Sequence, residues 1–207
     1  ADAEPYELRE DGITLTFQGE TLASPLRGIF NISNILAAAL FARSQGISLG
    51  TIKKALAAFK GVAGRMEKIA ASSPIRHGGG NFSVYVDYAH TPDALQNVYK
   101  VFPERRKICV LGATGGGRDT WKRPVLGKIA AADCAEVIIT NEDPYDENPE
   151  KIIDEVASGA VAHPKVMKIL DRRLAVRKAL SLARAGDVVL ITGKGTDPYI
   201  MGPHGTK

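Results

Sequence analysis

The sequence predicts an α/β fold with a mostly parallel sheet, and two observations carry this prediction. Short apolar runs rich in β-branched residues recur from Ser83 onward, as expected of buried strands. Each run but the last is followed by a stretch with the apolar spacing of a helix. Strands that alternate with helices are joined by right-handed crossovers, which give a parallel sheet covered on both faces. The sequence therefore predicts a Rossmann-like region over residues 83–207.

The individual elements of this region can be placed from the same pattern. The expected strands are 83–88, 107–112, 136–141, 165–170 and 187–192, and the expected helices are about 92–102, 121–133, 149–160 and 172–185. Ligands of such sheets bind beyond the carboxyl ends of the strands. Four segments follow strands and should meet at that edge: Asp87–His90, Gly112–Arg118, Asn141–Tyr145 and Gly193–Asp197. We therefore expect the binding site there.

Residues 1–80 show a different pattern. They contain a strand that ends in a turn (12–19), an Ala-rich helix (31–46) and a second helix (48–61). Gly46 is expected to cap the end of the first helix, and Ser48 the start of the second. One strand and two helices make a poor independent core, so we expect the tail of a larger domain. The segment 71–81, which contains Gly and Ser, should form a flexible turn.

The composition is that of an ordinary globular protein. The chain has 207 residues, of which 44% are hydrophobic, enough for a substantial core. It contains no apolar run of membrane-spanning length, and its first ten residues lack the layout of a signal peptide. The net charge of +4 is small, and the basic residues are scattered. We therefore expect a cytoplasmic protein that binds neither membrane nor nucleic acid, and whose substrate is a small molecule.

The two cysteines show no metal-binding spacing. Cys109 lies inside the apolar run 107–112, and Cys134 follows the next expected helix. Buried cysteines of this kind usually behave as small apolar side chains. We therefore expect buried free thiols and a reducing environment.

The glycine-rich stretch 112–119, GATGGGRD, invites comparison with a phosphate-binding loop. The Walker A pattern G-x-x-x-x-G-K-[ST] fits from Gly112 to Gly117. Arg118 and Asp119 then stand where the pattern requires Lys and Ser or Thr. The pattern alone leaves open whether this loop binds a nucleotide, binds another ligand or only turns the chain.

Four motifs occur together in the order and spacing of one known family. They are GIFNISNILAAA (28–39), GRMEKI (64–69), VDYAHTPDAL (86–95) and LGATGGGRDTWKRPVLGKIA (111–130). From about Leu26 to Gly195 the chain resembles the C-terminal part of the Mur ligases, and within them the enzymes that add the third residue of the peptidoglycan stem peptide. The resemblance implies a cytoplasmic, ATP- and Mg²⁺-dependent amide ligase. It would join a diamino acid such as lysine, ornithine or meso-diaminopimelate to UDP-MurNAc-L-Ala-D-Glu through an acyl phosphate.

The resemblance also implies a division of the chain. Residues 1–63 would be the end of the family's central ATP-binding domain, and residues 64–207 the C-terminal, acceptor-binding domain. The sequence contains no Walker A loop and no counterpart of the family's Mg²⁺-binding residues, which belong to the earlier part of the central domain. We therefore expect a monomeric C-terminal fragment of a longer ligase, with no catalytic residue of its own and no activity alone.

Several residues are expected near the nucleotide, namely Asn31, Asn34, Arg65, Asp87, His90 and Lys122. Of these, Asn31, Asn34, Arg65 and Asp87 resemble family residues that lie there. Asp87 would accept hydrogen bonds from a ribose diol, or only cap the following helix. His90 would approach the adenine or orient Asp87, or only form a turn. Lys122 and Arg123 would add positive potential, or only lie on a solvated helix face.

A second set matches the acceptor site of the family: Arg118, Glu142, Asp143, Tyr145, Gly193 and Asp197. The planar guanidinium of Arg118 suits the carboxylate of the incoming amino acid. On this interpretation the glycines of 112–117 turn the chain closely after a strand and do not cradle phosphates. Asp119 would orient Arg118 or cap the next helix, and Trp121 is expected to pack.

Two departures from the family bear on the acceptor. Members that add meso-diaminopimelate carry Asp-Asn-Pro-Arg where this chain has Glu-Asp-Pro-Tyr at 142–145. An arginine that would hold a second carboxylate is thus missing from an acidic segment, and we hypothesise an acceptor with a side-chain ammonium, such as lysine or ornithine. Glu147 and Glu150 are expected to favour the start of the next helix. The second departure lies in 193–198, which resembles the family's Gly-Lys-Gly-His-Glu but has Thr196 and Asp197 in place of His and Glu. Asp197 keeps a carboxylate for the α-amino group, with a shorter reach than Glu.

Two alternatives remain open. A folylpolyglutamate synthase shares the architecture, but it typically carries Asp-Gly-Ala-His-Asn-Pro, from which Tyr88 and Thr91 differ. The other alternative is a free-standing module that binds a nucleotide or an amino acid without catalysis. A phosphate-binding loop encoded upstream of Ala1 would exclude the second alternative.

Overall fold

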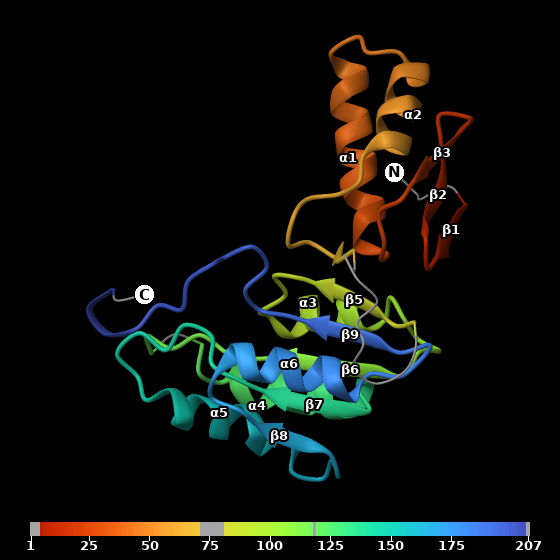
Figure 1. Cartoon of the computed structure of the whole chain (residues 1–207). Helices are drawn as coiled ribbons and strands as arrows, with labels where there is room; N and C mark the ends of the chain where they lie inside the picture. Colours follow the sequence, from red (N-terminus) through yellow and green to blue (C-terminus); the bar gives the residue numbers. More distant parts are fainter. Residues whose placement is uncertain (1–4, 71–80, 118, 206–207) are drawn as a thin grey trace. The chain divides into compact units, whose positions relative to one another are not determined.

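The structure is a computed structural model that describes residues 5–70, 81–117 and 119–205 (Figure 1). The chain divides into two compact units, Ala1–Val62 and Ala63–Lys207. Each unit has its own sheet, and the two are described separately. The expected turn at 71–81 lies outside the described residues except for Asn81, as does Arg118. Among the described residues no helix is both long and apolar enough to cross a membrane.

The first unit is a three-stranded antiparallel sheet with two helices. Its elements are β1 (Tyr6–Arg9), β2 (Gly12–Phe17), β3 (Glu20–Ser24), α1 (Phe30–Ser44) and α2 (Leu49–Ala58). The expectation of a single strand is wrong, because the chain reverses after β2 and forms β3. Gln18 and Gly19 both have positive φ angles, 51° and 79°, which permit this tight reversal.

The first unit has an apolar core of its own. Alternate residues of β2 face the helices, and the buried cluster consists of Ile13, Leu15, Phe17, Leu22, Ile32, Ile35, Ala39 and Ile52. The expectation of a poor core is therefore also wrong. The predicted helix ends are confirmed: Ser48 Oγ accepts a hydrogen bond from the Thr51 amide, and Gly46, with φ of 78°, follows the last residues of α1.

The second unit is built on a six-stranded sheet in the order β4-β5-β9-β6-β7-β8. The strands are β4 (Glu67–Lys68), β5 (Ser83–Val86), β6 (Lys107–Leu111), β7 (Glu136–Ile139), β8 (Val166–Lys168) and β9 (Val188–Ile191). All neighbouring pairs are parallel except β4 with β5. The predicted parallel sheet is thus confirmed. Only β4, which is two residues long, was not expected.

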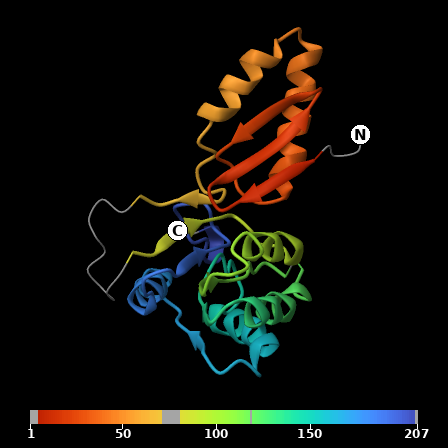
Figure 2. The same ribbon diagram turned by 90° about the vertical axis from the view of Figure 1, so that its right-hand side faces the viewer.

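Helices cover both faces of this sheet (Figure 2). They are α3 (Pro92–Tyr99), α4 (Lys122–Asp133), α5 (Pro149–Ala157) and α6 (Arg172–Leu182), with short 3₁₀ turns at Ser158–Ala160 and Pro203–Gly205. The helices α3, α4 and α5 pack side by side on one face, and α6 covers the other. Ile108 and Val110 of β6 pack towards Ala175 and Ala179 of α6, whose small side chains allow close contact.

The strand order places the last strand in the middle of the sheet. This strand, β9, lies between the first two parallel strands, β5 and β6. Ligands of open α/β sheets bind beyond the carboxyl ends of the strands. The carboxyl ends of β5, β9, β6 and β7 therefore lie along the edge where a ligand is expected.

The two cysteines form a disulfide between β6 and the end of α4. Cys109 is fully buried and Cys134 nearly so, and their Cα atoms are 6.1 Å apart. The expectation of free thiols is wrong, because α4 runs back across the sheet and ends beside the centre of β6. The inference of a reducing environment therefore loses its basis. The covalent ring closed by this disulfide contains the glycine-rich loop and all of α4.

Candidate functional site

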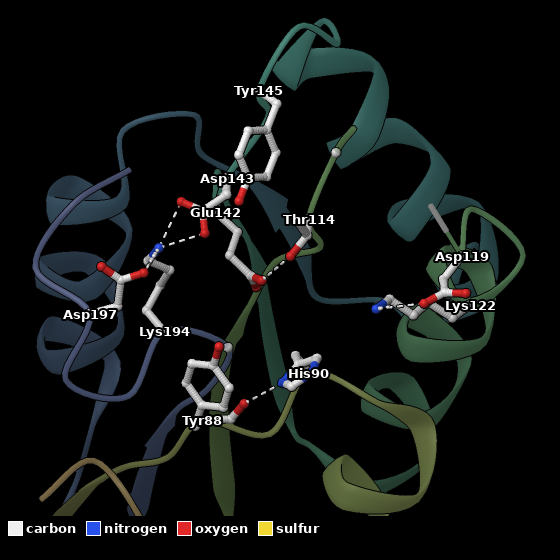
Figure 3. Close-up of a pocket in the computed structure, with 12 residues that line it drawn as sticks. Tyr88, His90, Thr114, Asp119, Lys122, Glu142, Asp143, Tyr145, Lys194 and Asp197 are labelled. Carbon is white, nitrogen blue, oxygen red and sulfur yellow. Dashed lines mark hydrogen bonds and ion pairs between the residues drawn. The ribbon is translucent and has the colours of Figure 1, made fainter. Parts of the chain in front are cut away.

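A polar pocket of about 220 Å³ lies at the carboxyl edge of the parallel sheet (Figure 3). Its walls come from segments that follow four strands. The lining residues are Tyr88 and His90 after β5; Thr114, Gly115, Asp119 and Lys122 after β6; Glu142, Asp143 and Tyr145 after β7; and Gly193, Lys194 and Asp197 after β9. The prediction that these four strand ends converge is confirmed.

Glu142 lines this pocket and has an unpartnered carboxylate oxygen. Only 2% of the residue is exposed, and its Oε1 accepts a hydrogen bond of 2.8 Å from the Thr114 hydroxyl. Its Oε2 is buried and has no hydrogen-bond partner among the described residues. A buried carboxylate oxygen without a donor is costly. The arrangement is suited to a ligand that brings an N–H group or a positive charge.

Two glycines make room for this carboxylate. A Cβ on Gly193 would collide with Glu142 Oε2, and one on Gly112 would lie 2.6 Å from the Thr140 carbonyl oxygen and 3.1 Å from Glu142 Cβ. Gly193 also has φ of 104°, which side chains rarely allow. Because β6 lies between β7 and β9, the Glu142 side chain passes from one strand end across the second to the third.

Lys194 pairs with two of the acids that line the pocket. Its Nζ donates to both carboxylate oxygens of Asp143, at 2.7 Å each, and to Asp197 Oδ2 at 2.6 Å. Burial by itself lowers the pKa of Lys194, but its hydrogen bonds with the two carboxylates outweigh burial and raise it. Lys194 was missed as a site residue. The available signal was a lysine directly after a strand and three residues before Asp197.

Asp143 also forms hydrogen bonds with backbone amides of two neighbouring segments. Its Oδ1 accepts from the Met201 amide at 2.8 Å, and its carbonyl oxygen accepts from the Gly115 amide at 2.7 Å. The Tyr145 amide donates to the Met201 carbonyl, and Tyr145 has a positive φ of 50°. Asp143 and Asp197 are therefore paired within the protein, whereas Glu142 has one oxygen without a hydrogen-bond partner among the described residues.

A second charged group, the Arg123 cluster, lies beside the pocket and consists of Arg123, Glu147 and Glu155. Arg123 is 1% exposed; its Nη1 donates to Glu147 Oε2 (2.9 Å) and Glu155 Oε2 (2.6 Å), and its Nη2 to the Thr114 carbonyl (3.1 Å). Glu147 Oε1 accepts from the Gly117 amide at 2.7 Å. The hydrogen bonds from Arg123 and Gly117 lower the pKa of Glu147 to about 2. The cluster thus fixes the glycine-rich loop.

These contacts correct two expectations about the Arg123 cluster. Neither Arg123 nor Lys122 lies on a solvated helix face, because α4 packs between α3 and α5. Arg123 is absent from the pocket lining and acts on its two glutamates instead of the ligand. Asn148 caps the start of α5 through hydrogen bonds from the Glu150 and Lys151 amides to its side chain, and Glu150 lies in the first turn, where an acid was expected.

The family model of the Mur ligase, glutamate ligase domain, matches residues 64–195, which contain every lining residue of this pocket except Asp197. The chain belongs to the Mur ligase family. The predicted family and fold class are thereby confirmed.

Comparison with individual Mur ligases shows what share of their length this chain covers. The UDP-N-acetylmuramoyl-L-alanyl-D-glutamate--2,6-diaminopimelate ligase of Syntrophomonas wolfei is 45% identical over 179 residues, which are 84% of this chain and 35% of that relative. A solved structure with the same enzyme name is 32% identical, with a TM-score of 0.61, covering 99% of this chain and 42% of that one. A MurF structure from Acinetobacter baumannii, at 21% identity, covers 92% and 41% and shares the fold with a TM-score of 0.72. The chain thus spans well under half the length of these Mur ligases.

Of the residues predicted to bind a nucleotide in this Mur ligase, His90 and Lys122 line the pocket. His90 Nδ1 lies 2.9 Å from the Tyr88 carbonyl oxygen, and its ring meets the Tyr88 ring edge-on at 4.9 Å. Arg65 lies over the Tyr88 ring, 4.2 Å from its centroid. Lys122 is 8% exposed, and its Nζ is 3.9 Å from Asp119 Oδ2. Arg65 and Lys122 therefore each lie beside a side chain that lines the pocket.

Asp87 is buried next to this pocket but does not line it. Its two carboxylate oxygens accept from the Met66 and Ala89 amides, both at 2.7 Å. Burial raises the pKa of Asp87, and these two hydrogen bonds partly oppose that shift. The alternative role as a helix cap is wrong, because Thr91 Oγ1 accepts from the Ala94 amide and starts α3. Contact with a ribose stays a prediction.

The remaining predicted residues of the Mur ligase chain lie elsewhere. Asn31 and Asn34 belong to α1 of the first unit, where the Asn31 side chain donates to the Arg27 carbonyl and accepts from Asn34. Arg118, the predicted carboxylate clamp, lies outside the described residues. Trp121 is 63% exposed, so the expectation that it packs is wrong.

Proposed function

We propose that this chain is the acceptor-positioning part of an ATP-dependent amide ligase of peptidoglycan synthesis. The carrying observation is the buried, unpartnered Glu142 Oε2 in a pocket at the strand ends of a Mur ligase fold. The names of the relatives support a donor of the UDP-MurNAc-L-Ala-D-Glu type and a diamino acid as acceptor. In the longer enzyme, ATP would phosphorylate the donor carboxylate and leave as ADP, and the acceptor amine would then attack the acyl phosphate, which forms the amide and releases phosphate.

The contribution of this chain is to bind and orient the acceptor. Glu142 holds an ammonium group through its free oxygen, and Arg118 holds the α-carboxylate. Gly193, Tyr145 and the pair Lys194–Asp197 shape the walls around these two contacts. Such positioning can supply roughly 7–11 kcal/mol of the reaction barrier when it replaces a bimolecular encounter. Asp143 supports the site by its hydrogen bonds and does not contact the ligand.

The nucleotide is assigned to a separate set of residues: Asn31, Arg65, Asp87, His90 and Lys122. Mg²⁺ would bridge the phosphates of ATP and offset their charge. Among the described residues no group of three or more His, Cys, Asp or Glu side chains could hold a metal ion. We therefore assign the Mg²⁺ ligands to a part of the ligase other than these residues.

The acceptor we propose is lysine or ornithine. Tyr145, which lines the pocket, stands where a cation would be needed for a second carboxylate, and Lys194 is already paired with Asp143 and Asp197. The ammonium end of lysine would meet Glu142. The names of the relatives point instead to diaminopimelate, so the two acceptors must be compared directly.

The experiment is a titration of the chain with lysine, ornithine, meso-diaminopimelate and norleucine, followed by amide chemical shifts. Lysine should bind and norleucine, which lacks the side-chain ammonium, should bind at least tenfold more weakly. Glu142→Gln should weaken the binding of lysine by about tenfold to a hundredfold, as expected for the loss of a charge-assisted hydrogen bond of roughly 1.5–3 kcal/mol. Glu150→Gln, an exposed acid of α5, is the matched control.

Each result of this titration decides a separate point. Equal affinity of the Glu142→Gln variant and the unchanged chain for lysine would remove Glu142 from the site. Tighter binding of meso-diaminopimelate than of lysine would overturn the acceptor assignment while leaving the ligase proposal intact. Binding of none of the four amino acids would count against the acceptor-positioning function itself.

We further propose that residues 1–63 are the end of the central ATP-binding domain, that residues 64–207 are the acceptor domain, and that the protein is cytoplasmic and monomeric. The division of the chain into two compact units supports the first point. Light scattering at micromolar concentration tests the last one, and a dimer would contradict it.

A further inference from the structure

Arg172, the first residue of α6, joins the ends of two strands from behind the pocket. Its Nη1 donates to the Asn141 carbonyl at 3.2 Å, and its Nη2 donates to the Thr192 carbonyl at 2.7 Å. Asn141 follows β7 and Thr192 follows β9, with β6 between these two strands. A single half-buried guanidinium therefore spans the ends of three neighbouring strands.

The two carbonyls that Arg172 holds immediately precede the two residues that meet in the pocket. Glu142 follows Asn141, and Gly193 follows Thr192. Glu142 Oε2 lies so close to the Gly193 Cα that no Cβ could be placed there. The distance between the two strand ends thus decides whether the carboxylate fits, and Arg172 is bonded to both of them.

The start of α6 is independently anchored to β7. The Leu170 carbonyl accepts from the Thr140 hydroxyl at 3.3 Å and from the Asn141 amide at 3.4 Å. Asp171 Oδ1 caps the helix through the Leu174 amide. Arg172 therefore projects from a fixed base, and its second nitrogen extends the connection from β7 to β9.

This placement of a cation is unfavourable for α6 itself. The N-terminus of a helix carries partial positive charge, which disfavours arginine in the first turn. Burial lowers the pKa of Arg172, and the charges of Glu142 and Asp143 oppose that shift. Asp143 is paired with Lys194 through its side chain. Arg172 thus occupies an unfavourable helix position while its guanidinium bonds the ends of two strands.

We infer that Arg172 is a positioning residue for the acceptor. It holds the ends of β7 and β9 at the spacing that seats the Glu142 carboxylate against Gly193. It does this without contacting the ligand, since Arg172 is not among the lining residues. The inference rests on the proposed function for the identity of the ligand, though not for the geometry of the strand ends.

The test compares Arg172→Ala and Arg172→Lys with Arg173→Ala, which removes an exposed cation from the same first turn. Without ligand, Arg172→Ala should shift the amide resonances of Glu142 and Gly193 and speed their hydrogen exchange. In the titration, Arg172→Ala should weaken the binding of lysine at least tenfold and change the binding of norleucine less than twofold, because the effect passes through Glu142. Arg172→Lys keeps the charge and should recover part of the lysine affinity. Arg173→Ala should leave both measurements unchanged.

The outcomes separate this inference from the proposed function. If Arg172→Ala leaves the Glu142 and Gly193 amides in place, the inference is overturned whatever the ligand does. If the binding of lysine and of norleucine weakens equally, Arg172 stabilises the fold but does not position Glu142. If the unchanged chain binds no amino acid while the amides shift, the proposed function fails and the positioning of the strand ends stands. If Arg172→Ala does not fold, the Arg172→Lys variant decides the same questions.

Discussion

The Arg123 cluster and the Glu142 side chain both bury charge beside the glycine-rich loop, and Thr114 contacts both. The Thr114 carbonyl accepts from Arg123, and its hydroxyl donates to Glu142. In the cluster one cation faces two carboxylates. In the pocket Glu142 has no cation within hydrogen-bonding distance among the described residues, and one of its oxygens is unpartnered. The first arrangement is complete in itself, and in the proposed function a ligand completes the second.

A buried polar atom without a hydrogen-bond partner does not by itself indicate a binding site; its position relative to a cavity matters as well. Arg123 Nε is also buried without a hydrogen-bond partner among the described residues, yet Arg123 does not line the pocket. Glu142 does line it (Figure 3). A buried unpaired group therefore indicates a binding site where a cavity reaches it, and otherwise indicates a cost that the fold tolerates.

The largest expected effect is on stability, from Arg123→Met. Removing the buried cation leaves two half-buried carboxylates without their partner and should cost about 3 kcal/mol of unfolding free energy, the low end of the range for buried pairs, because water can reach both carboxylates. Urea unfolding measures this loss. Lys128→Met, which changes an exposed lysine of the same helix, should cost less than about 0.5 kcal/mol. If Arg123→Met lowers the unfolding free energy as little as the control does, the Arg123 cluster does not stabilise the fold.

Gly193→Ala should have the next largest effect and should act on both stability and binding. A positive φ and the collision with Glu142 Oε2 together should cost about 1–3 kcal/mol, and the displaced carboxylate should lose lysine binding. Calorimetry and the lysine titration measure the two effects. Adding Glu142→Ala should restore part of the stability, because it removes the collision. Strictly additive costs would contradict a direct contact between the two residues.

Glu142→Gln should change the free energy of unfolding by less than about 1 kcal/mol, in contrast to Arg123→Met. An amide oxygen can still accept from the Thr114 hydroxyl, and no ion pair with a lining residue is lost. Urea unfolding of this variant gives the answer. A loss of several kcal/mol would show that the carboxylate already has a partner in the free protein, and the contrast with the Arg123 cluster would disappear.

The smallest effect concerns pH and distinguishes the two glutamates of the comparison. The folded pKa of Glu147, about 2, lies below its ordinary value of 4.5. Its stabilising contribution is therefore complete above about pH 4.5 and is lost as the pH falls towards 2. Unfolding free energies measured between pH 6 and 2.5 should fall more steeply for the unchanged chain than for Glu147→Gln. Parallel curves would show that Glu147 gains nothing from Arg123.

The sequence was sufficient for the parallel sheet and for the convergence of four strand ends. Both follow from alternating strands and helices, since parallel strands bring their carboxyl ends to one edge. It was insufficient for Arg123 and Lys194. Whether a lysine or arginine after a strand faces solvent, a ligand or a buried acid depends on packing between elements far apart in the chain, such as α4 against α5.

Other errors have the same origin. The strand β3 was missed because its sequence, Glu20–Ser24, is short and mostly exposed, and only pairing with β2 makes it a strand. The disulfide was missed because Cys109 and Cys134 are separated by 25 residues and meet only when α4 folds back over the sheet. Local patterns identify elements, and contacts between elements decide which side chains are paired.

The disulfide has a consequence for how the chain behaves once its backbone is cut. A protease that cleaves once between Cys109 and Cys134, for example in the exposed glycines at 116–117, leaves two fragments that remain joined through sulfur. On a denaturing gel without reductant the nicked chain should migrate as a single species, and two bands should appear only after reduction. The strand that precedes the glycine-rich loop and the helix that follows it are therefore inseparable even when the loop itself is broken.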